Sequence, residues 1–330
     1  MNNALQQPFS REVLTIDPSA TALSIEAWLR TTVARTLHRR GAIVAVSGGV
    51  DSAVCAALAQ RALGSQRVHT LFLPGQNSTP QSRQRARELC AGLDLPLEEQ
   101  DIAPALQSLG CYTMRDAAIA RVFPDYRPGQ RYKITIASGM LERDRANVFD
   151  LVLEGQGGQL QRARLPLDSY LELVAATNMK QRMRKLLEYR AAEARNYAVI
   201  GTPNRLEFEQ GFFVRGGDGL ADCKPIAHLY KTQVYALAEY LGVPASIRAE
   251  QPSTDTYSLP QTQEEFFFAL PYATLDLLLF AHRHAVPIAE VAAVMQMLPE
   301  QVERAFRDIE LKKQHAQRLH QPALLCEAVE

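Results

Sequence analysis

The chain has 330 residues, 47% of which are hydrophobic, and it carries 36 basic and 36 acidic side chains. This length and composition can bury one large α/β core, or a core with a sizeable appendage. Because the charges balance, no global basic field points to non-specific polyanion binding, and we expect no nucleic acid partner.

The amino-terminal residues and the cysteines indicate the cellular compartment in which we expect the protein. The start of the chain lacks the basic and apolar regions of a secretion signal, and no apolar run approaches the roughly 20 residues of a membrane span. The five cysteines include no Cys-x-x-Cys pair, which is typical of free thiols in a reducing compartment. We therefore expect a soluble, cytoplasmic protein with no membrane partner.

Helices and strands alternate in the first hundred residues. Apolar residues at helical spacing predict a helix over 22–40, and apolar runs predict strands at 42–46, 68–73 and 97–102. Helical sequence separates these strands. The alternation predicts an α/β fold with a doubly wound, Rossmann-like parallel sheet, in which ligands bind beyond the carboxyl ends of the strands.

The turn after the first predicted strand carries the strongest functional signal. It reads Ser-Gly-Gly-Val-Asp-Ser over 47–52 and opens a helix. Small residues let the backbone approach a phosphate, and the first N–H groups and the dipole of a helix favour its charge. Asp51 would repel a phosphate unless a cation lay between them, so we interpret it as a magnesium ligand. An ordinary capped turn is the alternative, since Ser and Asp are also common caps.

The alternation breaks after residue 110. An alternating run at 132–136, an apolar run at 148–153, and a Gly-rich hairpin turn at 155–158 that leads into 159–164 predict a small β-containing insertion over 111–166. A lid over the site and a decoration at a loop or dimer edge are both open interpretations. We divide the chain into the first half of a nucleotide-binding domain at 1–110, an insertion at 111–171, and the second half with a helical C-terminal part at 172–330.

The last part of the chain returns to helices. Charged helical sequence runs from Asn178 to Arg195, and a strand is predicted at 197–201. A helix over 229–241 ends at a glycine. A long polar loop over 249–265 then precedes apolar helices to about residue 295 and a basic helix over 300–318.

The motif at 47–52 resembles the PP-loop of the N-type ATP pyrophosphatases, enzymes that split ATP between its α and β phosphates. Further segments narrow the resemblance to the NAD synthetase family, across about 20–105 and 172–315. They read Asn-Met-Lys-Gln-Arg-Met-Arg at 178–184, Gly-Thr-Pro-Asn-Arg-Leu-Glu at 201–207, Gly-Gly-Asp-Gly-Leu-Ala-Asp at 216–222, Leu-Tyr-Lys-Thr-Gln-Val at 229–234 and Pro-Ser-Thr-Asp at 252–255.

The resemblance implies a reaction. In this family ATP adenylates the carboxylate of nicotinic acid adenine dinucleotide and releases pyrophosphate, and ammonia then displaces AMP to leave the amide of NAD. Such chemistry requires cations and oriented donors more than a proton-transfer base. It implies ATP as co-substrate, Mg²⁺, a homodimer, and ammonia taken up free or from a separate partner protein, because the chain shows no glutamine-splitting cysteine motif.

The resemblance also implies roles for individual residues. Asp51 and Glu207 would hold Mg²⁺, while Lys231 and Ser253 would bind phosphate and take part in catalysis with Asp51. The other nucleotide and dinucleotide contacts would come from Ser47, Gly48, Gly49, Val50, Ser52, Lys180, Arg182, Thr202, Asp218 and Asp222. The plain alternatives are a solvated lysine for Lys231, a surface charge for Arg182, and turn formation for the last two aspartates.

Three segments depart from the family pattern. Gln263 stands where the closing loop usually has an aspartate, Gly216 and Arg215 replace an aromatic residue and a lysine, and Arg85 replaces an acidic residue. The ATP half of the site is therefore intact while the acceptor half differs. A ligase of the same fold that amidates another carboxylate, or a nucleotide-binding protein without turnover, remains an alternative.

Overall fold

The computed structural model describes residues 8–136, 149–155, 157–251, 257–263, 267–268 and 270–327. Ser253, part of the predicted closing loop, and the middle of the predicted insertion lie outside the described residues.

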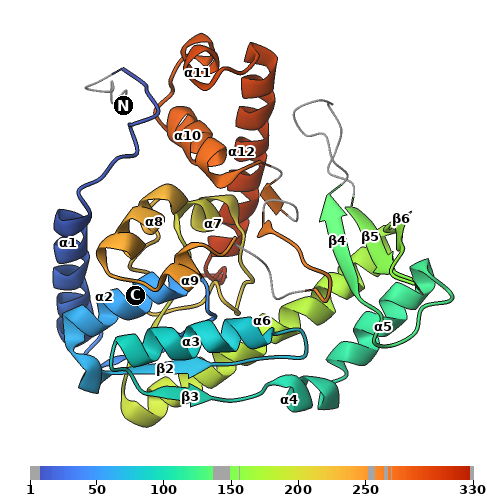
Figure 1. The fold of residues 1–330 in the computed structure, drawn as a ribbon, viewed down its shortest axis with the longest axis horizontal. Helices are drawn as coiled ribbons and strands as arrows, with labels where there is room; N and C mark the ends of the chain where they lie inside the picture. Colours follow the sequence, from blue (N-terminus) through green and yellow to red (C-terminus); the bar gives the residue numbers. More distant parts are fainter. Residues whose placement is uncertain are drawn as a thin grey trace.

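A four-stranded parallel sheet lies between helices that cover its two faces. Its strands are β1 (Ala42–Ala45), β2 (Val68–Phe72), β3 (Leu97–Glu99) and β7 (Ala198–Ile200), in the order β3-β2-β1-β7; β2 and β3 are labelled in Figure 1. All three strand pairs are parallel. The chain moves outward from β1 to β3 and then returns to the other side of β1, so the topological switch point lies between β1 and β7. The predicted strands and fold class are confirmed.

The two faces of the sheet pack against different helices. Val44 and Ile200 point toward α1 (Pro18–Thr31), α2 (Val50–Leu63) and α3 (Pro80–Gly92) in one core. Ile43 and Val199 point to the opposite face, against α4 (Ala103–Ser108), α5 (Cys111–Val122) and the long α6 (Leu167–Arg195). Successive strand residues point to opposite faces, and both faces are covered, which explains the uninterrupted apolar runs of these strands.

A second, antiparallel sheet lies in the segment that we expected to be an insertion. Its strands are β4 (Tyr132–Ile136), β5 (Phe149–Glu154) and β6 (Leu160–Arg164), in that order. The inner face of this sheet packs against α5 and against Leu173 of α6. Helix α6 begins at Leu167, so our expectation of a start at Asn178 was wrong, and the boundary placed between 171 and 172 falls inside this helix.

Helices make up most of the remaining chain. They are α7 (Arg205–Gln210), α8 (Lys231–Tyr240), α9 (Ala245–Arg248), α10 (Tyr272–Arg283), α11 (Ile288–Met295) and α12 (Pro299–His320). The last three share an apolar core with Phe9 and Leu14 from the amino-terminal segment. Within the described residues, no helix has the length and apolar character needed to cross a membrane. The described structure pairs none of the five cysteines in a disulfide.

Candidate functional site

The turn between β1 and α2 has the geometry of an anion cradle. Gly48 has a φ of +83°, and a Cβ there would lie 2.6 Å from the carbonyl oxygen of Ser82, so only glycine fits. Inside the turn, Ser52 Oγ donates to the carbonyl oxygen of Gly49 (2.9 Å), and the Gly49 N–H donates to Ser47 Oγ (3.3 Å). Because Gly49 is the N-cap of α2 and has no side chain, the first N–H groups of the helix are not covered by a cap.

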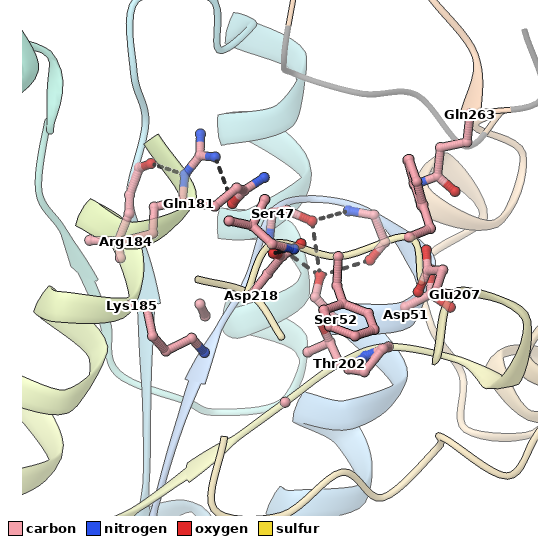
Figure 2. A pocket seen from close by; sticks show the side chains of 18 of the residues that line it. Ser47, Asp51, Ser52, Gln181, Arg184, Lys185, Thr202, Glu207, Asp218 and Gln263 are labelled. Atoms are coloured by element: carbon pink, nitrogen blue, oxygen red, sulfur yellow. Dashed lines mark hydrogen bonds between the residues drawn. The ribbon is translucent and has the colours of Figure 1, made fainter. Parts of the chain in front are cut away.

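Three segments bring polar side chains together at the switch point. Asp51, in the first turn of α2, accepts a hydrogen bond from Asn204 Nδ2 (3.2 Å) and forms an ion pair with Lys231 at the start of α8. Asn204 follows β7 and caps α7. It shares a capping box with Glu207, in which each backbone N–H donates to the other residue's side chain at 3.1 Å. Figure 2 shows Asp51 and Glu207 side by side.

This cluster is buried and electrostatically coupled. Lys231 is 1% exposed. Burial, followed by the charge of Asp51, raises the pKa of Glu207 to about 8, while Lys231 opposes the rise. Burial lowers the pKa of Lys231, but the two carboxylates outweigh this effect and leave that pKa raised. The site therefore holds a charged Lys231 beside two acidic groups, and burial favours the protonated form of Glu207.

The raised pKa of Glu207 predicts a pH dependence of stability. Between about pH 4.5 and 8 the folded state keeps a proton that the unfolded state loses, so the free energy of unfolding falls as pH rises, by up to about 1.4 kcal/mol per pH unit. Chemical denaturation of the ligand-free protein across this range measures the slope. Glu207→Gln should flatten it, whereas Glu209→Gln on the same helix should not. Equal slopes in all three proteins would contradict the assignment.

A cavity of about 690 Å³ extends from the turn toward α6. It is lined by most of the predicted site residues, namely Ser47, Gly48, Gly49, Val50, Asp51, Ser52, Arg182, Thr202, Glu207, Asp218 and Lys231. The structure therefore brings these residues together around one space.

Of the predicted residues that the structure describes, two do not line this cavity. Lys180 is 5% exposed on α6, and its charge acts on the Cys111 thiol of α5. Asp222 accepts a hydrogen bond from the Val199 N–H (2.7 Å) and another from Tyr189 OH (3.2 Å), so it fixes the loop beside β7. Their proposed contacts with nucleotide remain predictions.

The far end of the cavity holds charged residues that the sequence analysis did not identify. Lys185 and Glu188 of α6, both 4% exposed, form an ion pair of 2.6 Å. Asp218, which was a predicted site residue, lines the same cavity and has an exposed side chain, yet the surrounding protein raises its pKa. Burial also raises the pKa of Glu188. A Lys and a Glu three residues apart are an ordinary surface pair in sequence, so no local signal could have marked them as buried.

The departures from the family pattern also lie near this cavity. Gln263 lines it and accepts a hydrogen bond from Tyr272 OH. Arg215 lines it as well and donates from Nη2 to the Gln321 carbonyl oxygen (2.9 Å). Arg85 lines the cavity from α3 and forms an ion pair with Glu250.

Fold and site together define a class of protein. A parallel sheet whose switch point carries a Ser-Gly-Gly turn, two acidic groups and a buried lysine is a nucleotide-phosphate site of the PP-loop type. The family model described as NAD synthase matches residues 22–135 and 153–320. The chain therefore belongs to the NAD synthase family, and the predicted resemblance is confirmed. The internal residues that the match leaves out, 136–152, fall within the segment that we expected to be an insertion.

Individual relatives agree with this membership. The chain is 47% identical over 326 residues to an "NH(3)-dependent NAD(+) synthetase" of Rhizobium rhizogenes, covering 99% of this chain and 98% of that protein. It is 48% identical over 322 residues to the protein of the same name from Rhizobium meliloti, covering 98% and 96%. A solved NMN synthetase structure from Francisella tularensis has a TM-score of 0.63 at 23% identity, covering 94% of this chain and 99% of that one, which shows the shared fold alone.

Proposed function

We propose that the chain catalyses the ATP-dependent amidation of nicotinic acid adenine dinucleotide by ammonia, which yields NAD, AMP and pyrophosphate. The observation that carries this proposal is the 47% identity to an ammonia-dependent NAD synthetase over nearly the whole of both chains. An identity of that extent spans both halves of the site. The cluster at the switch point supplies the groups that such a reaction needs.

The reaction takes place in two steps. A carboxylate oxygen of the acid forms a bond to the α-phosphorus of ATP, and the bond from that phosphorus to the bridging oxygen breaks to release pyrophosphate. Ammonia then forms a bond to the acyl carbon, loses a proton, and displaces AMP. Both steps bring electron-rich groups together, so a fixed positive charge and oriented N–H donors favour them.

The chain's own residues fit these needs. The turn over 47–52 holds the phosphates with its backbone N–H groups and with the hydroxyls of Ser47 and Ser52. Lys231, which is buried and charged, offsets negative charge at the phosphates and stabilises the departing pyrophosphate. Thr202, at the end of β7, contacts the nucleotide from the other side of the switch point.

The residues present also fit a magnesium ion. Asp51 and Glu207 lie close enough that the charge of one raises the pKa of the other, and a cation removes that conflict. Within the described ranges, no group of three or more His, Cys, Asp or Glu residues could hold a metal, but magnesium in nucleotide sites usually takes one or two carboxylates plus phosphate oxygens. When bound, the ion would neutralise phosphate charge.

The remaining predictions concern partners and location. We propose a homodimer, as the resemblance to the family implies. Free ammonia or a separate ammonia-supplying protein would provide the nitrogen. The cytoplasmic location remains a prediction, supported by five cysteines outside any disulfide.

A product assay tests the proposed function. The purified protein is incubated with ATP, Mg²⁺, ammonium and nicotinic acid adenine dinucleotide, and NAD and pyrophosphate are measured over time. We expect equal amounts of both products, and no NAD when glutamine replaces ammonium. Pyrophosphate release that depends on a different acid would instead indicate a ligase with another acceptor. Tight ATP binding without cleavage for any acid would contradict catalysis.

A further inference from the structure

Arg85 is a largely buried arginine that lines the cavity at the switch point and has no role in the proposed reaction. It projects from α3, with 13% of its side chain exposed, and it lines the cavity. Its Nη1 lies 2.8 Å from Glu250 Oε2. Its Nε is buried and has no hydrogen-bond partner in the part of the chain that the structure describes.

The position of Arg85 places it beside the phosphate turn. Ser82, one helical turn earlier on α3, has its carbonyl oxygen 2.6 Å from where a Cβ of Gly48 would lie. Residues three apart on a helix share a face, and Ser82 and Arg85 both line the cavity. Arg85 therefore borders the space that a phosphate held by the turn would occupy.

The other cations of the cavity have partners within the protein. Lys231 is paired with Asp51, and Lys185 with Glu188. Arg184 donates to the Leu73 carbonyl oxygen (3.0 Å), and Arg182 donates to that of Arg215 (3.3 Å). The partner of Arg85 is Glu250, whose side chain is 41% exposed. Because Glu250 can be solvated by water, Arg85 can exchange it for another acceptor.

We propose that Arg85 is a further phosphate-binding residue, which exchanges Glu250 for oxygens of the nucleotide or of pyrophosphate. A guanidinium is always charged, and its planar fork donates two parallel hydrogen bonds to a phosphate. The buried Nε would gain an acceptor in that exchange. The proposal rests on the proposed function only in that the cavity takes a nucleotide.

Two variants that break the same ion pair give opposite results under this proposal. Binding of the Mg²⁺ complexes of pyrophosphate and of α,β-methylene-ATP to the full chain is measured by calorimetry. Arg85→Gln should weaken binding about tenfold to a hundredfold, the value of charged hydrogen bonds. Glu250→Gln removes the competing carboxylate, so it should tighten binding by up to about fivefold, since the pair is partly exposed. The double variant should behave like Arg85→Gln.

Arg83→Gln is the matched control, because Arg83 lies on the same helix, is paired with Glu99 (3.3 Å), and does not line the cavity. It should bind as the wild type does. Weaker binding in both Arg85→Gln and Glu250→Gln would show that the pair is only structural, and wild-type binding in Arg85→Gln would show no phosphate contact; either result overturns the proposal.

If Arg85→Gln fails to fold, Glu250→Gln still tests the proposal. Tighter binding of the Mg²⁺ complexes by that variant would support it, and weaker binding would overturn it. Loss of NAD formation in the product assay with normal nucleotide binding would contradict the proposed function and leave this inference standing.

Discussion

Asp51→Asn is expected to lower pyrophosphate release about a thousandfold or more while the protein stays folded. Asparagine keeps the shape and can still accept the hydrogen bond from Asn204, but it removes the charge that pairs with Lys231 and that would hold magnesium. We expect the fold to survive because Glu207 remains as an acidic group near Lys231. Loss of the Asp51 charge lowers the pKa of Glu207, which favours its charged form beside the lysine.

Steady-state pyrophosphate release and thermal unfolding measure these two effects. Asp168→Asn is the matched control, because Asp168 occupies the first turn of α6 as Asp51 occupies that of α2, and it does not line the cavity. That variant should keep full activity. Undiminished turnover in Asp51→Asn would remove Asp51 from the mechanism.

Lys231→Met should also reduce turnover strongly, by about a hundredfold to a thousandfold, because it removes the buried positive charge beside the phosphates. Methionine fills much of the same volume, so packing changes little. The free energy of unfolding should fall by about 3 kcal/mol, because the substitution leaves Asp51 without its charged partner. This value is at the low end of the range for a buried ion pair, because the side chain of Asp51 is partly exposed. The pKa of Glu207 should rise further, because Lys231 holds it down.

Lys312→Met provides the comparison for that change. Lys312 is 12% exposed in its side chain and paired with Asp308 at 2.7 Å on α12, and it does not line the cavity. The same substitution there should leave turnover unchanged. If Lys231→Met kept wild-type turnover, or if both variants lost activity equally, Lys231 would have no special role at the phosphates.

The sequence predicted the parts of the molecule that depend on local pattern. The strands of the parallel sheet are continuous apolar runs because both faces are covered by helices, and the phosphate turn is a contiguous motif at the end of one of them. Glu207 and Lys231 were predicted by resemblance. The switch point explains why they meet Asp51, since α7 and α8 follow β7, which lies next to β1.

The sequence could not predict contacts that depend on tertiary packing. Lys185 and Glu188 are spaced like an exposed helical pair, and only the packing of α6 over the sheet buries them. Arg85 was identified as a departure, but its contact with Glu250 joins α3 to the segment after α9. Asp222 likewise accepts a hydrogen bond from the Val199 N–H, a contact that depends on how its loop packs beside β7.

The start of helix α6 also could not be predicted from the sequence. The sequence after Pro166 mixes exposed leucines with polar residues, so it lacks a clear apolar face. Helix formation there depends on neighbours that are distant in sequence, because Leu173 packs into the core of the antiparallel sheet. A pattern read one segment at a time does not contain that information.

Transfer of an oxygen isotope tests the two-step chemistry most directly. Nicotinic acid adenine dinucleotide is labelled with ¹⁸O in its carboxylate and turned over with ATP and ammonium, and the phosphorus products are examined by mass spectrometry and ³¹P NMR. The proposed chemistry predicts that one labelled oxygen passes to AMP and that pyrophosphate is unlabelled. Formation of ADP with labelled inorganic phosphate, or AMP without label, would contradict it.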